Sequence, residues 1–272
     1  MDNRPIGVFD SGLGGLTVVR ELLARLPQED LVYFGDTGRV PYGTHSPETI
    51  ARYAEQDSRF LQSHGVKLIV AACGTVSTTA PQVLAGLPVL SMGVLEPAAD
   101  AALAATKNGR IGVLGTSATV RSGAFDAYLK SKRDVAVFSQ ACPLFVSLVE
   151  SGWIERDNEA TVAVARRYLQ PLREQGVDTV ILGCTHFPLL SPVLSDILGE
   201  GVTLINSGAA CAARCEELLR EQDALCDRER EGSCQFYVSD RPQGFSAVAD
   251  MFLGRRVEQD IHRVNLEEMD RV

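Results

Sequence analysis

The sequence contains no uninterrupted apolar stretch long enough to span a bilayer. Its first residues, Met1 to Pro5, lack the charged segment and apolar core of a secretory signal peptide. We therefore expect a cytoplasmic protein that has no membrane partner.

Clusters of positive charge are also missing. The chain carries a formal net charge of −9 and has a sequence pI near 5.0. The densest basic runs are pairs such as Arg166-Arg167 and Arg255-Arg256, which are typical of solvated faces. Because phosphate neutralisation needs clustered Lys and Arg, we expect no nucleic-acid partner.

Closely paired cysteines are absent, although the chain has seven cysteines. An odd count without a secretion signal indicates reduced thiols rather than a disulfide framework. Cys211 and Cys215 lie four residues apart on one expected helix face, and Cys226 and Cys234 follow. With no nearby histidine, they are interpreted as small buried side chains, and we expect no metal site.

What is present is a chain of 272 residues with 45% apolar content, enough for one large or two ordinary globular domains. Its first part alternates short Val- and Ile-rich runs with helical patterns, which predicts a parallel sheet. The expected strands are Ile6–Phe9, Leu31–Phe34, the run before Cys73 and Pro88–Leu90, and the expected helices are Thr17–Leu26 and Pro47–Ser63.

The second part repeats this series at an offset of 104 to 115 residues. Arg110–Thr116 corresponds to Ile6–Ser11, Val135–Phe138 to Leu31–Phe34, and Val202–Asn206 to Leu87–Ser91. Self-similarity of this length indicates a duplicated unit. We predict an α/β fold of two pseudo-symmetric, doubly wound parallel-sheet domains with the active site in the cleft between them.

The first domain is expected to comprise residues 1–97 and 208–272, and the second residues 98–207. The strand Gln235–Val238 and the helix Gly244–Leu253 would return the chain to the first domain. Gly254–Val272 is strongly charged and is expected to be a loosely held tail or a short helix.

Two cysteines occupy equivalent places in the two halves. Cys73 and Cys184 each follow a glycine by eight residues and close an apolar run. The carboxyl ends of parallel strands face ligand crevices, and the N–H dipoles of a following helix favour a thiolate. A single such cysteine is more often an inert buried thiol, but the duplicated position favours a reactive pair. The pair could serve redox chemistry, a soft metal, or acid–base chemistry on opposite faces of one carbon.

The Gly-rich turn from Asp10 to Gly15 lies between an expected strand and helix. It is a weak match to a dinucleotide loop, with Asp36 as the ribose acid, since Thr17 replaces the third glycine and Asp10 would repel a pyrophosphate. The turn suits an amino acid better. Ser11 and backbone amides would hold a carboxylate, and Asp10 would accept a proton or steer a thiol.

Thr116, with Ser117 and Thr119 after it, takes the corresponding place in the second half. Helix capping would explain these residues equally well and is compatible with binding. The turn Pro41-Tyr42-Gly43 either directs amides into the cleft or only connects two elements. His186, two residues after Cys184, would tune that thiol or donate to a substrate. Glu150 by itself has the pattern of a helix-end surface carboxylate.

Three segments closely resemble the glutamate racemase family: Phe9-Asp10-Ser11-Gly12-Leu13-Gly14-Gly15-Leu16, Gly35 to Gly43, and Leu182-Gly183-Cys184-Thr185-His186-Phe187-Pro188. The resemblance extends from about Ile6 to Leu253. It implies a cofactor-independent isomerase that interconverts L- and D-glutamate and supplies D-glutamate for peptidoglycan synthesis, cell wall biogenesis and cell shape. It also implies two α/β domains and a homodimer.

By the same resemblance, Cys73 and Cys184 are the two catalytic acid–base residues of a two-base mechanism. Asp10 would assist Cys73, whereas Glu150 and His186 would assist Cys184. The implied substrate-binding residues are Asp10, Ser11, Tyr42, Gly43, Gly74, Thr75, Thr116, Thr119, Thr185 and His186.

One departure from the family lies beside the first thiol, where the usual Cys-Asn-Thr is Cys73-Gly74-Thr75. Without the Asn side-chain amide, the site lacks a hydrogen bond to a charged substrate group that would contribute about 1.5–3 kcal/mol to substrate binding. Affinity or specificity is therefore expected to differ more than reaction type. A racemase of aspartate or another acidic amino acid, and a non-catalytic regulatory protein of the same fold, are the alternatives.

Lysine is scarce, and the four lysines are Lys67, Lys107, Lys130 and Lys132. All four are expected at surface positions, where strands start or helices end. No lysine is then expected in the cleft to form a Schiff base with pyridoxal phosphate, which agrees with a cofactor-independent reaction. A dry, donor-rich pocket between two closing domains would have to stabilise the carbanion.

Overall fold

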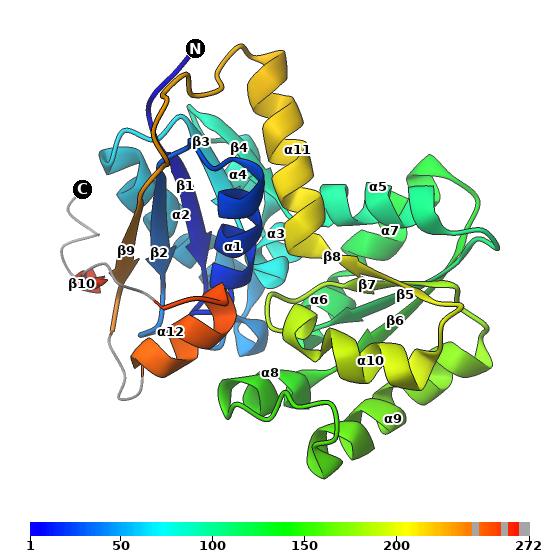
Figure 1. The fold of residues 1–272 in the computed structure, drawn as a ribbon. Coiled ribbons are helices and arrows are strands. Elements are labelled where there is room, and N and C mark those ends of the chain that lie inside the picture. Colours follow the sequence, from blue (N-terminus) through cyan, green and yellow to red (C-terminus); the bar gives the residue numbers. More distant parts are fainter. Residues whose placement is uncertain (241–244, 257–260, 267–272) are drawn as a thin grey trace.

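The computed structural model describes residues 1–240, 245–256 and 261–266. It contains two sheets, each with strands that are all parallel, and helices that pack around them (Figure 1). The predicted fold class, two parallel-sheet α/β domains, is confirmed.

The first sheet has six strands in the order β10-β9-β2-β1-β3-β4. Its inner strands β1, β2 and β3 are buried along their whole length because helices cover both faces. The strands are β1 (Ile6–Asp10), β2 (Leu31–Gly35), β3 (Leu68–Ala71), β4 (Leu90–Gly93), β9 (Cys234–Val238) and β10 (Ile261–Arg263).

The second sheet has four strands in the order β6-β5-β7-β8. In the first sheet, β1 lies between β2 and β3. In the second sheet, β5 lies between β6 and β7 in the same way, as duplication predicts. The strands are β5 (Arg110–Gly115), β6 (Ala136–Ala141), β7 (Thr179–Leu182) and β8 (Thr203–Asn206).

The helices begin and end where the chain offers caps and apolar stripes. In α2, the Ser46 hydroxyl accepts a hydrogen bond from the Thr49 amide at 3.3 Å, Pro47 occupies the first turn, and Ile50, Ala54 and Leu61 are buried. The first domain contains α1 (Leu16–Arg25), the 3-10 turn η1 (Tyr42–Thr44), α2 (Pro47–Ser63), α3 (Gly74–Thr79), α4 (Pro81–Ala85) and α12 (Phe245–Leu253).

Around the second sheet lie α5 (Leu95–Ala105), α6 (Ser117–Ser122), α7 (Ala124–Lys132), α8 (Pro143–Glu150), α9 (Glu159–Glu174), η2 (Phe187–Leu190) and α10 (Ser191–Leu198). The chain crosses between the sheets twice, after β4 and again after β8. The second crossing is α11 (Ser207–Glu221), which packs against both α1 and α5 (Figure 1). The domain limits at 97/98 and 207/208 stay a prediction.

Two expectations about strands need correction. The strand expected at Pro88–Leu90 is β4, Leu90–Gly93, since its backbone pairs in register with Leu68–Ala71. Within the charged C-terminal segment, Ile261–Arg263 is a strand rather than a tail or helix, because it pairs with Phe236–Val238 of β9. Gly244, the expected first residue of the last helix, lies outside the described residues.

Lys67 also contradicts its expected surface position. It is 3% exposed, and its ammonium pairs with Glu29 at 2.6 Å and donates to the carbonyl oxygens of Asp2 and Ala224. A charge at the start of a central strand is buried here because these oxygens replace its hydration. No helix within the described ranges combines the length and apolarity that crossing a membrane requires.

Candidate active site

A cavity of about 170 Å³ lies where the carboxyl ends of the two sheets face each other. Its walls follow β1, β3, β5 and β7, in agreement with the rule that ligands bind beyond the carboxyl ends of parallel strands. Of the predicted site residues, the lining includes Ser11, Tyr42, Gly43, Cys73, Gly74, Thr75, Thr116, Glu150, Cys184, Thr185 and His186.

Cys73 enters the cavity from the first domain. It follows β3 directly and occupies the N-cap position of α3. Its Sγ donates to Oγ of Ser11 at 3.5 Å. Burial, reinforced by the negative charge of Asp10, raises the pKa of the Cys73 thiol to about 12. At neutral pH this sulfur therefore holds its proton.

Asp10 stands behind the lining of the cavity. The carboxyl group is 1% exposed, and its Oδ2 accepts a hydrogen bond from the Gly12 amide at 3.1 Å. Its Oδ1 has no hydrogen-bond partner among the described residues. Burial raises the pKa of Asp10, and the nearby His186 opposes that shift. A buried carboxyl with a free oxygen can exchange a proton with a neighbour.

Cys184 enters from the second domain, and its neighbours differ from those of Cys73. Its Sγ lies 3.8 Å from Nδ1 of His186, whose Nε2 lies 3.0 Å from Oε1 of Glu150. Burial alone would lower the pKa of His186, but the interactions with Cys184 and Glu150 raise it to about 10. The imidazole is therefore protonated at neutral pH beside the second sulfur.

Threonine hydroxyls line the cavity between the two thiols. Oγ1 of Thr75 lies 3.0 Å from Oγ1 of Thr116, which joins the two domains across the cleft. Thr116 caps α6 by accepting from the Thr119 amide at 3.1 Å, and its hydroxyl donates to that of Thr119 at 3.0 Å. Capping and lining thus coexist at Thr116, whereas Thr119 contacts a lining residue instead of the cavity.

The turn containing Tyr42 borders the cavity, but its phenol is engaged elsewhere. The hydroxyl donates to Asp36 and contacts Oδ2 of Asp57 at 3.0 Å. Burial and the neighbouring Asp36 raise the pKa of Asp57 well above its usual value, whereas Arg39, 3.1 Å from Oδ1 of Asp57, opposes that shift. Asp36 is itself fully buried and also accepts from Ser239, which rules out its weak interpretation as a ribose-binding acid.

One wall of the cavity was not predicted from the sequence, apart from Glu150, which the family resemblance supplied. Pro143, Val146, Ser147 and Glu150 all line it from α8. Their spacing of three, four and seven residues places them on one helix face. That periodicity ending at Glu150 was the available signal, and it would have distinguished Glu150 from an ordinary helix-end carboxylate.

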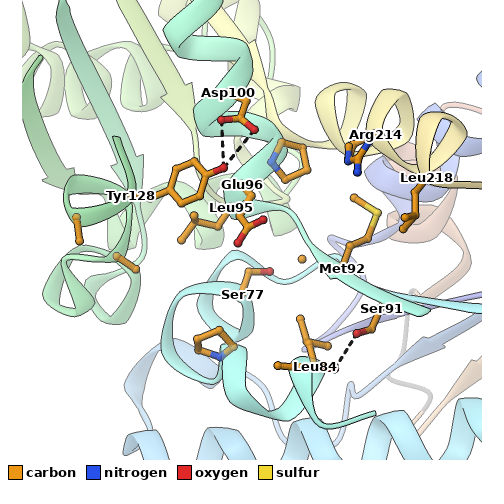
Figure 2. A pocket seen from close by; sticks show the side chains of 16 residues that line it. Ser77, Leu84, Ser91, Met92, Leu95, Glu96, Asp100, Tyr128, Arg214 and Leu218 are labelled. Atoms are coloured by element: carbon orange, nitrogen blue, oxygen red, sulfur yellow. Dashed lines mark hydrogen bonds between the residues drawn. The ribbon is translucent and has the colours of Figure 1, made fainter. Parts of the chain in front are cut away.

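A larger cavity of about 610 Å³ lies elsewhere between the domains. Figure 2 shows Tyr128 and Asp100 directed toward each other on one side and Arg214 and Leu218 of α11 on the other. The Tyr128 hydroxyl lies 3.2 Å from each carboxylate oxygen of Asp100. The lining of this cavity includes neither a cysteine nor a histidine, so the thiol chemistry belongs to the smaller cavity.

The other cysteines are also buried, and none of them lines the cavity that contains Cys73 and Cys184. Cys211 and Cys215 are both fully buried in α11, and all seven cysteines are free thiols. Within residues 1–240, 245–256 and 261–266, no group of three His, Cys, Asp or Glu side chains is placed to hold a metal ion.

Comparisons with known proteins agree with this geometry. Residues 6–215 match the family model described as Asp/Glu/Hydantoin racemase. A glutamate racemase from Geobacter metallireducens is 47% identical over 266 residues, which cover 97% of each chain.

Two solved structures are also similar over the whole fold. A glutamate racemase from Francisella tularensis in complex with D-glutamate superposes with a TM-score of 0.91, at 36% identity, covering 98% of this chain and 100% of that chain. A glutamate racemase isoform from Bacillus anthracis gives a TM-score of 0.92 at 34% identity, covering 98% and 99%.

Proposed function

The chain belongs to the Asp/Glu racemase family and is an isomerase, and from this premise we propose that it interconverts L- and D-glutamate through its two thiols, without a cofactor. One observation carries the proposal: Cys73 and Cys184 border the same cavity from the carboxyl ends of β3 and β7. Two sulfurs on opposite walls suit a reaction that moves a proton from one face of a carbon to the other.

In the proposed reaction, the thiolate of one cysteine takes the α-proton of glutamate and becomes a thiol. The electron pair stays on the α-carbon as a carbanion. The opposite thiol then gives its proton to the other face and becomes a thiolate. The configuration is inverted, and the two cysteines have exchanged protonation states.

Different neighbouring residues would assist the two cysteines in proton transfer. The raised pKa of the Cys73 thiol, about 12, favours Cys73 as the acid, with Asp10 behind it as a proton acceptor in the reverse direction. Protonated His186, held by Glu150, faces Cys184 and would stabilise its thiolate. This division makes Cys184 the base and Cys73 the acid for one of the two enantiomers.

The substrate carboxylates would be bound by hydroxyls and amides already at the cavity wall. Ser11 and Thr75 offer hydroxyls from the first domain, and Thr116 and Thr185 from the second. Gly43 and Gly74 offer backbone at the same wall. Donors fixed before the reaction stabilise the developing carbanion without reorganisation, particularly where the closed domains exclude water.

Exchange of the α-proton tests the reaction and the substrate together. L-Glutamate and L-aspartate are each incubated with the enzyme in D₂O, while loss of the α-proton signal and optical rotation are followed. We expect exchange and racemisation with glutamate and much slower change with aspartate. Exchange with aspartate alone would assign the chain to aspartate, and exchange with neither would indicate a non-catalytic protein.

Replacement of each thiol tests the mechanism. Cys73→Ser and Cys184→Ser should each lose racemisation by several orders of magnitude while retaining some one-sided exchange, because only one proton carrier remains. Cys211→Ser, in a buried thiol outside the cavity, is the matched control. Racemisation at the wild-type rate in either active-site variant would refute the two-thiol reaction.

We further propose that the product D-glutamate supplies peptidoglycan synthesis in the cytoplasm, and that the protein acts as a homodimer. The proposal follows from family membership and from the small-molecule cavity. Sedimentation velocity tests the dimer. Depletion of the protein should cause loss of cell shape that external D-glutamate corrects, and failure of that correction would exclude the biosynthetic role.

A further inference from the structure

Gly74 and Gly183 bring the backbones of the two domains into contact between the two thiols. Gly74 directly follows Cys73 and opens α3, whereas Gly183 directly precedes Cys184. A Cβ atom added at position 74 would stand 2.1 Å from the carbonyl oxygen of Gly183 and 3.2 Å from its carbonyl carbon. Any side chain at position 74 is therefore excluded while the domains stay where they are.

Hydrogen bonds within each domain hold both backbones in place. The Gly183 amide donates to the Leu114 carbonyl oxygen at 2.8 Å, and a Cβ atom at position 183 would meet that same oxygen at 2.8 Å. The carbonyl oxygen of Gly74 accepts from the Thr78 hydroxyl at 2.8 Å inside α3. Because these bonds resist local movement, we expect a clash at this point to push the two domains apart.

We propose that Gly74 is a positioning residue: its missing side chain lets the domains close until their backbones touch, and this contact sets the separation of the Cys73 and Cys184 sulfurs. The inference rests on the proposed two-thiol reaction. On this proposal, Gly74 in place of the family's usual Asn does more than remove one hydrogen bond to substrate. It also removes a side chain that would keep the two domains apart.

Other contacts across the cleft depend on the same closure. The Thr17 hydroxyl of the first domain donates to the Thr185 carbonyl oxygen at 2.9 Å, and Thr75 and Thr116 meet at 3.0 Å. Since Cβ atoms are essentially never found closer than 3.0 Å to such an atom, a side chain at position 74 must open this gap by nearly 1 Å. Both hydrogen bonds would be stretched.

The expected kinetic effect is large because the reaction needs both sulfurs within reach of one carbon. A misplacement of about 1 Å in an active site can cost about 10²-fold in rate. We therefore expect Gly74→Ala to lower kcat by about 10- to 100-fold. The thermal unfolding temperature should stay within about 2 °C, since each domain keeps its own core and only closure is opposed.

Gly86→Ala is the matched control. Gly86 ends α4 with φ −88° and ψ −3°, and an added Cβ would make ordinary contacts at 3.4 and 3.7 Å. The Gly86→Ala variant should therefore leave kcat unchanged. Gly74→Asn, with a larger side chain, should be at least as slow as Gly74→Ala.

The outcomes separate cleanly. A slow Gly74→Ala enzyme with normal thermal stability supports the proposal. Wild-type kcat in Gly74→Ala, or a higher kcat in Gly74→Asn, overturns it. An unfolded or strongly destabilised Gly74→Ala protein also overturns it, because the strain would then lie within the first domain. Cys73→Ser and Cys184→Ser, assayed in parallel, show separately whether the two-thiol reaction itself holds.

Discussion

The Nε2 atom of His186 lies 3.0 Å from Oε1 of Glu150, while the opposite ring nitrogen faces Sγ of Cys184 at 3.8 Å. The imidazole is thereby fixed between a carboxylate and a thiol. Phe252 of α12 packs edge-on against the same ring, with 5.0 Å between centroids. A segment that the chain reaches only near its end thus holds the histidine in place.

Glu150→Gln should shift the alkaline limit of activity. The Glu150 carboxylate is one reason that the pKa of His186 lies near 10, so its removal should lower that pKa. Because the Glu150 side chain is 50% exposed, we expect a shift of only about one pH unit. The measurement is kcat against pH, where the fall at high pH should begin earlier. Glu174→Gln, in an exposed carboxylate on α9, should leave the profile unchanged. An unmoved profile in Glu150→Gln would show that Glu150 does not govern this proton.

His186 should also make stability depend on pH. Its pKa is raised from 6.5 to about 10 in the folded protein. The resulting stabilisation is fully present below pH 6.5 and is lost as pH rises toward 10, at up to about 1.4 kcal/mol per pH unit. His186→Asn should flatten this slope in urea titrations between pH 6.5 and about 8, below the ordinary cysteine pKa of 9.0 at which the unfolded thiols begin to titrate. His262→Asn, on exposed β10, should retain it. Identical slopes in wild type and His186→Asn would contradict the assignment.

Thr17→Val should weaken closure of the domains. The variant loses the hydroxyl proton that the Thr185 and Gly14 carbonyl oxygens share, each at 2.9 Å, a net contribution of at most about 1 kcal/mol. We expect kcat/KM to fall by up to about 5-fold, as that energy implies. Thr17→Ser keeps the hydroxyl and should restore most of the rate. Equal rates in the two variants would mean that the hydroxyl has no part in closure.

Lys67→Met should destabilise the fold and spare the chemistry. Lys67 and Glu29 are buried together, so loss of one partner leaves an uncompensated charge at a cost of about 3–5 kcal/mol. Adding Glu29→Gln should recover part of this loss, because Gln can still accept from the Cys226 amide. Chemical denaturation measures both variants. The rate per folded molecule should not change, since the ion pair lies at the amino end of β3, away from the cleft.

The repeated pattern of short apolar runs was sufficient to predict both sheets and to place Cys73 and Cys184 at equivalent strand ends. Such features are local, since burial on both faces dictates strand composition. The resemblance to a family then supplied Glu150, whose own surroundings in the sequence look like an ordinary surface helix end.

What the sequence did not predict depends on contacts between distant segments. β10 forms because Ile261–Arg263 meets β9, and Lys67 is buried because Glu29 and two carbonyl oxygens converge on it. The close approach of Gly74 to the Gly183 carbonyl oxygen depends on how the two domains are placed relative to each other. The local sequence around either glycine does not predict that placement.

The two crossings of the chain limit how the cleft can open. One follows β4 and the other leads from β8 into α11, and α11 packs against α5, where the first crossing ends. Two adjacent covalent connections oppose sliding and twisting but permit rotation about the line that joins them. Substrate would then enter by a hinge rotation of one domain relative to the other about this line. Each closure would return the sulfurs of Cys73 and Cys184 to the same alignment.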